Sequence, residues 1–264
     1  MRILTKNSHF HIVEPTAIAI GKFDGLHLGH QKLLAQILAC KEQGLASCVF
    51  TFTPSPAVFF GWQDDLELMT TAEKRDYFER LGVDYVVEFP LTKESASMDP
   101  SDFVRQVLTE QLHLQFLAAG EDVSFGKGGL GNAALLRKLS TELGFTLRLI
   151  EKVAYRDQII SSSYVRRAVL GGDLTLATVL LGTPYEIIGE IDADGLMRNV
   201  PPTKLLPPPG DYLGMLYSLD NQPLTDQIVI HIYSYIQHPC CNLELPGSIC
   251  DFPPNVRLVL LRRL

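Results

Sequence analysis

The stretch TAIAIGKFDGLHLGHQKLL, residues 16–34, passes from a short apolar run to a helical pattern through a turn that holds two histidines. Residues 16–20 predict a buried strand that ends at Gly21. Residues 31–43 have the apolar spacing of a helix. The positions that carry this spacing are Leu33, Leu34, Ile37 and Leu38. A strand, a glycine turn and a helix in this order begin an α/β unit.

The same alternation continues through most of the chain. Further strands are expected at 46–52, 84–89, 116–119 and 146–150, and helices at 72–82, 100–113, 132–143, 162–171 and 174–181. Alternation of this kind predicts a Rossmann-like α/β domain with a parallel sheet, whose ligands bind at the carboxyl ends of the strands. Beyond Pro184 come short β-rich runs at 185–191, 212–217, 227–236 and 256–262. We therefore expect two domains, an α/β domain over 1–184 and a small all-β, barrel-like domain over 185–264.

Composition excludes several classes of protein. The 264 residues include 23 Lys and Arg against 30 Asp and Glu, a net charge of −7, which argues against nucleic-acid binding. No apolar run approaches the ~18–20 residues that span a bilayer. The first residues, MRILTKNSHFHIVEP, do not resemble a secretory signal, so we expect a cytoplasmic protein.

Cysteines and histidines outside the first turn do not predict a metal site. No two cysteines have CxxC spacing, and together with the late histidines they fit no tetrahedral ligand pattern. The residues considered are Cys40, Cys48, His231, His238, Cys240, Cys241 and Cys250. We expect small buried side chains or inert thiols instead.

The two histidines of the first turn, His27 and His30, flank Gly29 where a helix is expected to open. Free backbone N–H groups and the helix dipole favour an anion there. Gly29 allows a phosphate to approach the backbone, and each imidazole can donate a ring N–H to phosphate oxygens. The turn therefore predicts a phosphate site.

GKFDGLHLGH resembles the HxGH signature of nucleotidyltransferases, in the FDGxHxGH form of the bacterial FAD synthetases. That family is usually bifunctional with riboflavin kinase. Other segments resemble it in the same order, namely VFTFTPSPAVFF (49–60), LTKESASMDPSDFV (91–104), AAGEDVSFGKGGLGN (118–132), IISSSYVRRAVLGGDL (159–174) and LLGTPYEIIGEI (180–191). The resemblance covers about 16–191 and implies an HxGH nucleotidyltransferase domain over 1–184.

The resemblance implies the site residues. It assigns ATP phosphate binding to His27 and His30, and closure over the same phosphates to Arg166. The other nucleotide-binding positions that it implies are Gly21, Phe23, Asp24, Gly29, Gly120, Asp122, Ser161 and Ser162. The flavin-binding positions are Thr53, Pro54, Ser55 and Pro56, with Ser55 where the family commonly has His.

Two expectations come from the residues themselves. Ser162 and Ser163 can cap the helix that follows, and Arg166 lies one turn from Ser162 on that helix. Asp24 is expected to orient a neighbouring group rather than to touch the nucleotide.

The reaction that the resemblance implies is ATP + FMN → FAD + pyrophosphate, with Mg²⁺ accompanying ATP. ATP and FMN are then the partners, and no oligomeric state is predicted. Two alternatives stay open. One is adenylyl or cytidylyl transfer to another phosphorylated acceptor, which Ser55 allows. The other is a catalytically weak, regulatory protein that binds flavin or nucleotide.

The second domain resembles a degenerate riboflavin kinase domain. The family's GRxxGxPTAN segment corresponds to 194–205, where Thr203 is kept but Lys204 and Leu205 replace Ala and Asn. The region after Tyr212 is short for the full kinase barrel, and no catalytic Glu has a counterpart. Loss of the Asn and the carboxylate removes a magnesium ligand and a base. We expect a truncated barrel without kinase activity that is structural or helps to place the flavin.

Overall fold

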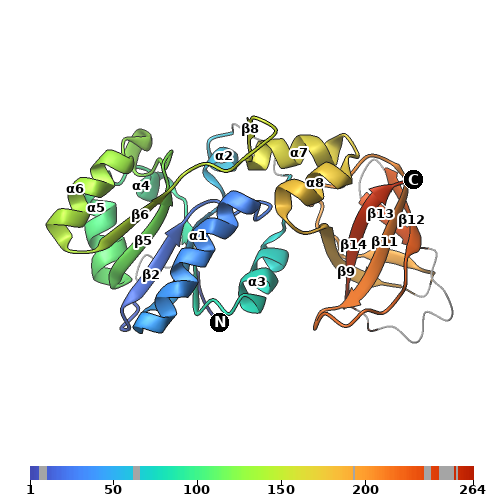
Figure 1. Cartoon of the computed structure of the whole chain (residues 1–264), viewed down its shortest axis with the longest axis horizontal. Helices are drawn as coiled ribbons and strands as arrows, with labels where there is room; N and C mark the ends of the chain where they lie inside the picture. The colour runs from blue at the N-terminus through green and yellow to red at the C-terminus, as the bar shows by residue number, and fades with distance from the viewer. Residues whose placement is uncertain (6–10, 62–65, 193, 235–238, 244–252, 254) are drawn as a thin grey trace. The chain divides into compact units, whose positions relative to one another are not determined.

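A computed structural model describes the chain except for residues 6–10, 62–65, 193, 235–238, 244–252 and 254 (Figure 1). The chain forms two compact units. The first, here the sheet unit, contains Met1–Phe23, Gly29–Asp64 and Lys74–Val153. The second, here the barrel unit, contains Asp24–Leu28, Asp65–Glu73 and Ala154–Leu264.

The sheet unit is built on a six-stranded sheet in the order β1-β4-β3-β2-β5-β6. Its strands are β1 (Arg2–Thr5), β2 (Thr16–Ile20), β3 (Ala46–Thr53), β4 (Tyr85–Pro90), β5 (Leu114–Gly120) and β6 (Thr146–Ile150). Every neighbouring pair is parallel. The strand order reverses at β2, which lies between β3 and β5. In open parallel sheets ligands bind outside the carboxyl ends of the strands at this reversal, which is where the turn after β2 begins.

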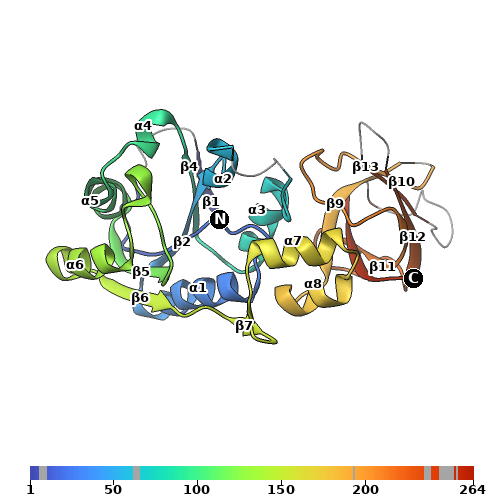
Figure 2. The ribbon, with the colours of Figure 1, turned by 90° about the horizontal axis from the view of Figure 1, so that it is seen from above.

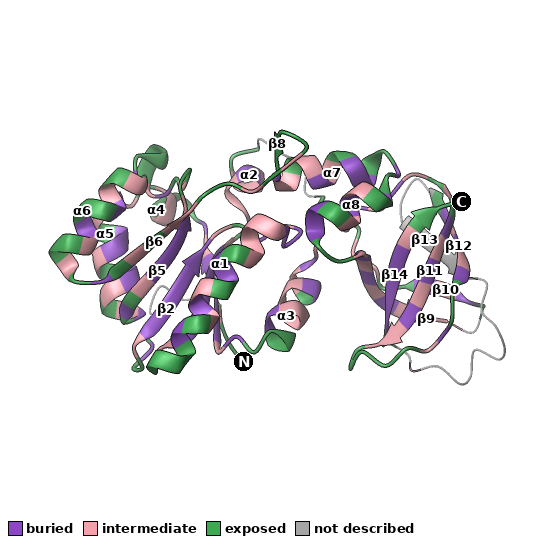
Figure 3. Ribbon diagram, in the orientation of Figure 1, coloured by how far each residue is buried: buried purple, intermediate pink, exposed green. Residues whose placement is uncertain are grey.

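Both faces of the sheet are covered, and Figure 3 shows β2 buried along its length. Apolar side chains on one face form a large part of the core of this unit. Ile18 on β2, Phe50 on β3 and Leu117 on β5 are fully buried in it. A π-type helix, η2 (Phe103–Gln111), and α6 (Ala133–Leu143) supply the covering side chains. Strand residues alternate between the two faces, so the intervening positions belong to the other face. The remaining elements that connect these strands are α1 (Leu28–Ala39), η1 (Cys40–Gln43), α2 (Pro56–Phe59), α3 (Thr71–Arg80), α4 (Lys93–Ala96), α5 (Pro100–Asp102) and η3 (Lys127–Gly129).

The barrel unit carries six antiparallel strands that close in the order β10-β13-β12-β11-β14-β9 (Figure 2). They are β9 (Tyr185–Ile191), β10 (Leu196–Arg198), β11 (Gly210–Ser218), β12 (Ile228–Ser234), β13 (Pro239–Leu243) and β14 (Asn255–Arg263). Pairing of β10 with β9 completes the ring. The register of β11 shifts between Leu213 and Gly214, where a Cβ would lie 2.6 Å from the Val259 carbonyl oxygen. Only glycine fits this close approach.

Two helices and a small hairpin precede the barrel in the same unit. The hairpin is β7 (Ala154–Tyr155) with β8 (Gln158–Ile159), and the helices are α7 (Ser162–Leu170) and α8 (Leu174–Leu181). The two helices pack on each other, and α8 also packs on β9 and β14. The helix that carries Arg166 is therefore anchored to the barrel.

The predicted fold class is confirmed, with a Rossmann-like parallel sheet followed by a small β barrel. The sequence prediction omitted β1, whose four residues are mostly exposed at the edge of the sheet. The helix expected at 100–113 is present, but it begins as α5 and widens to π geometry from Phe103. No helix in the described ranges is long and apolar enough to cross a membrane.

Candidate active site

The turn after β2 has a left-handed backbone at three positions, which brings the chain from the strand into α1. Phe23, Gly25 and Leu26 have φ values of 51°, 81° and 46°. A Cβ at Gly25 would lie 2.8 Å from the Leu68 Cδ1 atom, so this position accepts only glycine without rearrangement. His27 then directly precedes α1, and Gly29 and His30 are its second and third residues.

In the sheet unit, the Phe23 side chain is fully buried beside His30. The centroids of these two rings are 5.2 Å apart, and the Phe78 ring meets Phe23 edge-on at 5.8 Å. A Cβ at Gly21 would lie 3.2 Å from the Phe23 ring. Gly21 and Phe23 therefore build the packing on which the His30 imidazole rests.

The His27 side chain is buried in the barrel unit. Its burial lowers the pKa of the imidazole to about 4, because water no longer stabilises the charged form. At neutral pH the ring is uncharged and carries a single N–H donor.

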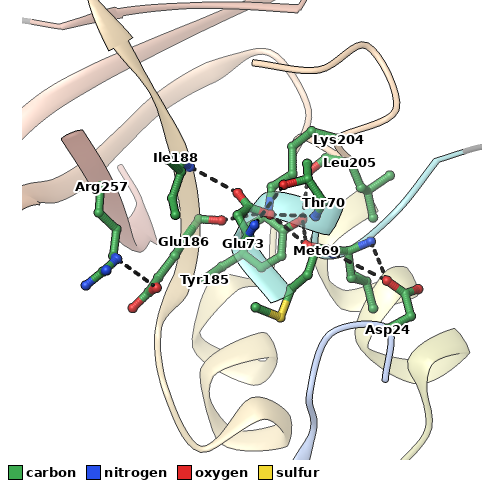
Figure 4. A network of polar contacts seen from close by, with 11 residues as sticks. Asp24, Met69, Thr70, Glu73, Tyr185, Glu186, Ile188, Lys204, Leu205 and Arg257 are labelled. Atoms are coloured by element: carbon green, nitrogen blue, oxygen red, sulfur yellow. Dashed lines mark hydrogen bonds and ion pairs between the residues drawn. The ribbon is translucent and has the colours of Figure 1, made fainter. Parts of the chain in front are cut away.

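Asp24 binds several polar groups of the barrel unit and lies at one end of the network drawn in Figure 4. Its Oδ2 lies 3.0 Å from the Arg166 Nη2 atom. Its Oδ1 accepts hydrogen bonds from the Leu68 and Met69 backbone N–H groups, at 2.9 and 3.3 Å. Arg166 also donates through Nη1 to the Leu66 carbonyl at 2.7 Å. The FDG turn and the helix α7 therefore meet at one ion pair, across 142 positions of sequence.

The serines at the start of α7 have two different structural roles. Ser161 is the N-cap, and its Oγ accepts from the Tyr164 N–H at 3.3 Å. The expectation that Ser162 and Ser163 cap the helix is therefore wrong by one residue. The Ser162 hydroxyl instead donates to the Asp24 backbone carbonyl at 2.8 Å. The backbone carbonyl and the side-chain carboxylate of Asp24 are therefore both bound to residues of α7.

The predicted flavin segment ends β3 in the sheet unit. The Thr53–Pro54 peptide is cis, and Pro56 is the first residue of α2. Ser55 caps this helix by accepting from the Val58 N–H at 3.4 Å. A serine replaces the family's usual histidine here and serves as a helix cap.

Gly120 is the last residue of β5 in the same unit, and Asp122 follows the strand. Asp122 pairs with Lys152 at 2.9 Å on the surface. A Cβ at Gly120 would lie 3.0 Å from the Asp122 Oδ1 atom, so the two positions are adjacent at the carboxyl end of β5. That edge is where the fold predicts ligand binding.

A second polar cluster, which the sequence did not predict, surrounds Lys204 (Figure 4). The Lys204 ammonium is buried and lies 2.8 Å from Glu73 Oε2, 2.8 Å from the Leu68 carbonyl and 2.7 Å from the Glu186 carbonyl. It also lies 4.4 Å from the centre of the Tyr185 ring, and burial raises the pKa of the Tyr185 hydroxyl. All three ammonium protons thus have acceptors. The sequence signal was Lys204 itself, which stands in a motif position where the family has alanine.

A cavity of about 500 Å³ in the sheet unit lies at the opposite edge from the HxGH turn. Arg2, Ala46 and Tyr85, the first residues of three strands, are among its lining residues. Its Lys41 and Asp84 side chains pair at 2.9 Å. This cavity therefore lies at the amino ends of the strands, away from the predicted chemistry.

Metal ligands are not gathered in the described residues, where no cluster of three His, Cys, Asp or Glu side chains could hold an ion. His238 and Cys250, considered above as ligands, lie outside the described residues. His231 lies on β12, where its Nδ1 is 2.6 Å from the Asp211 Oδ1 atom.

Comparison with known proteins decides the family. The model of the FAD synthetase family matches residues 9–164. The chain belongs to this family. The matched residues include Asp24 and Ser162, which are hydrogen-bonded to each other, and Arg166 lies just beyond the match.

Curated relatives carry the name bifunctional riboflavin kinase/FMN adenylyltransferase. The one from Bacillus subtilis is 40% identical over 181 residues, 66% of this chain and 55% of the relative. The one from Haemophilus influenzae is 35% identical over 182 residues, 68% of this chain and 59% of the relative. The chain thus spans less than two thirds of the length of these relatives.

A solved structure shares the fold over the whole chain. A crystal structure titled macrolide-efflux protein, from Streptococcus pneumoniae, superposes with a TM-score of 0.82. It covers 100% of this chain and 91% of its own, at 21% identity. This likeness shows the fold, a parallel sheet with a following barrel.

Proposed function

We propose that this chain is an FMN adenylyltransferase, which transfers AMP from ATP to FMN and gives FAD and pyrophosphate. Family membership and the names of the curated relatives support this reaction. The single structural observation that supports it best is the Asp24–Arg166 ion pair. It joins the FDG turn of the first motif to the arginine of the last, and the arginine keeps donors for an anion.

In the proposed reaction, a phosphate oxygen of FMN attacks the α-phosphorus of ATP. The bond from that phosphorus to the bridging oxygen breaks, and pyrophosphate leaves. No protein nucleophile takes part, so catalysis consists of positioning and charge stabilisation. Mg²⁺ bound to ATP would supply charge neutralisation at the phosphate oxygens.

Each binding residue has a chemical reason for its proposed role. His30 and the neutral His27 donate ring N–H groups to the triphosphate. Arg166 uses two N–H groups on Asp24 and Leu66, and a guanidinium carries five, so three can bind phosphate. The nucleotide positions proposed from the family pattern are Gly21, Phe23, Asp24, Gly29, Gly120, Asp122, Ser161 and Ser162. Those proposed for flavin are Thr53, Pro54, Ser55 and Pro56.

We further propose that riboflavin kinase activity is lost. Lys204 stands where the kinase pattern has a small residue, and its ammonium is buried and fully bonded. A lysine held in this way is not available to bind a phosphate. Under this proposal, residues 1–184 transfer AMP and residues 185–264 are a degenerate kinase barrel. A cytoplasmic location and the absence of nucleic-acid partners stay predictions from sequence.

The test is to incubate the chain with ATP, Mg²⁺ and FMN and to measure FAD by chromatography. We expect FAD from FMN and no FMN or FAD from riboflavin. His30→Ala should lower the rate by roughly 10²-fold, the size of a lost transition-state donor. Another phosphorylated acceptor consumed in place of FMN would support the alternative transferase. Nucleotide binding without turnover would support the regulatory alternative.

A further inference from the structure

The segment Leu66–Thr70 of the barrel unit is bonded along its length to two different parts of that unit. On one side, the Leu68 and Met69 N–H groups donate to Asp24, and the Leu66 carbonyl accepts from Arg166. On the other side, the Leu68 carbonyl accepts from Lys204 and lies 2.9 Å from the Tyr185 hydroxyl. The two sides of residue 68 therefore face the proposed phosphate-binding arginine and the barrel.

Backbone pairing fixes the same segment to the barrel's Lys204 loop. The Glu67 N–H donates to the Thr203 carbonyl at 2.6 Å, and the Leu205 N–H donates to the Glu67 carbonyl at 2.8 Å. The Leu68 side chain is fully buried, and its Cδ1 is the atom that a Cβ at Gly25 would meet. The segment is therefore held by side chain and backbone alike.

The Glu73 carboxylate binds the end of the segment at Thr70. Its Oε2 accepts from the Lys204 ammonium at 2.8 Å and from the Thr70 N–H at 2.7 Å. Its Oε1 accepts from the Ile188 N–H of β9 at 3.0 Å. The Thr70 hydroxyl accepts from the Glu73 N–H, which completes a capping box at the start of α3. Lys204 thus holds both the Leu68 carbonyl and the carboxylate that ends the segment.

We propose that Lys204 and Asp24 are positioning residues for the bound nucleotide: through Leu66–Thr70, the barrel holds Asp24, and Asp24 holds the Arg166 guanidinium in place for a phosphate. This rests on the proposed function, because the phosphate role of Arg166 belongs to it. An arginine side chain has many rotamers, and an anion that binds an ordered one loses less entropy. The barrel then contributes to ATP binding without touching ATP.

The experiment measures the affinity for Mg²⁺–α,β-methylene-ATP by calorimetry, without turnover. Lys204→Met alone leaves the Glu73 carboxylate buried without its partner, so the variant used is Glu73→Gln with Lys204→Met. We expect its affinity to fall by roughly 10-fold, because a small misplacement of a binding group is costly. In an Arg166→Met background, the same pair of substitutions should change the affinity by less than about twofold.

A matched control separates positioning from general loss of stability. Ile230→Ala removes a fully buried side chain on β12, which pairs with Tyr212 of β11 and Leu243 of β13. It should lower the melting temperature and leave the affinity of the analogue within about twofold of wild type. If the Lys204 variant does not fold, Asp24→Asn takes its place in the same cycle, and the expected pattern is unchanged.

Two outcomes overturn the inference. One is wild-type affinity in a folded Glu73→Gln, Lys204→Met variant. The other is an equal loss with and without Arg166, which would mean that Lys204 acts on the structure at large. A wild type that binds the analogue but forms no FAD would overturn the proposed function alone. A wild type that forms FAD, with additive effects in the cycle, would overturn the inference alone.

Discussion

Two ion pairs of the barrel unit, Asp24–Arg166 and Glu73–Lys204, have similar lengths but differ in burial and in the number of unused N–H donors. Their N–O distances are 3.0 and 2.8 Å. The side chains of the first are 18% and 17% exposed, and those of the second are 4% and 1% exposed. Arg166 keeps donors beyond those it uses, whereas every ammonium proton of Lys204 has an acceptor.

The difference separates binding from support. A partly exposed cation with unused donors can bind an anion, and its substitution costs the protein less stability than substitution of a buried cation. A buried cation with no unused donor can only stabilise the fold, and its removal leaves a buried carboxylate without its partner.

The largest effect is expected for Lys204→Met. It leaves Glu73 uncompensated and should lower the free energy of unfolding by about 3–5 kcal/mol. Arg166→Met should lower it less, by about 1–2 kcal/mol, because this pair is partly exposed and Asp24 keeps two backbone N–H donors. Urea unfolding of both variants measures the two values. Equal losses would remove the contrast between the pairs.

The effect on catalysis should run the other way. Arg166→Met removes phosphate donors and should slow FAD formation by about 10²- to 10³-fold. The control is Arg167→Met, the next residue on α7, which is exposed and lies 5.5 Å over the Tyr164 ring. It should keep near wild-type turnover. Similar rates in the two variants would contradict the role of Arg166.

Acid should destabilise the chain through His27. Its pKa is about 4 when folded, below the ordinary 6.5, so the unfolded chain binds a proton first as the pH falls. The His27 contribution to stability is thus complete above pH 6.5 and falls by about 3 kcal/mol towards pH 4. His27→Gln should lose less stability than wild type over that window in urea unfolding. Parallel curves for the two proteins would count against a buried neutral ring.

The smallest effect concerns the cap of α7, the helix that carries Arg166. Ser161→Ala removes the acceptor for the Tyr164 N–H and should cost about 1 kcal/mol. The neighbouring Ser163 is exposed, so Ser163→Ala should stay within about 0.5 kcal/mol of wild type. Thermal unfolding of both variants decides between them. A larger loss at Ser163 would restore the expectation made from sequence.

The parts of the fold that have a strong local sequence pattern could be predicted from the sequence. Strands β2 to β6 and the HxGH turn were predicted within a few residues, because apolar spacing and glycine placement are local properties. Edge strand β1 was missed because its four residues are mostly exposed. The cap of α7 was misplaced by one residue, since three serines in a row offer the same local signal.

Contacts across long sequence separations were beyond such patterns. The expectation that Asp24 orients a neighbouring group fits its bond to Arg166, but the partner could not be named from sequence. The Lys204–Glu73 pair joins residues 131 positions apart, and no local pattern predicts that these two side chains meet. Pairs of this kind are set by tertiary packing, so they became visible only in the structure.

The most direct measurement follows the phosphorus atoms of ATP. The chain is given Mg²⁺ and ATP labelled either at the α- or at the γ-phosphorus, with FMN or riboflavin as acceptor. Adenylyl transfer predicts that the α label enters FAD and that the γ label leaves in pyrophosphate. Loss of the kinase predicts that no γ label enters any flavin. A γ-labelled flavin would contradict the loss of the kinase, and an α label that never reaches FAD would contradict adenylyl transfer to FMN.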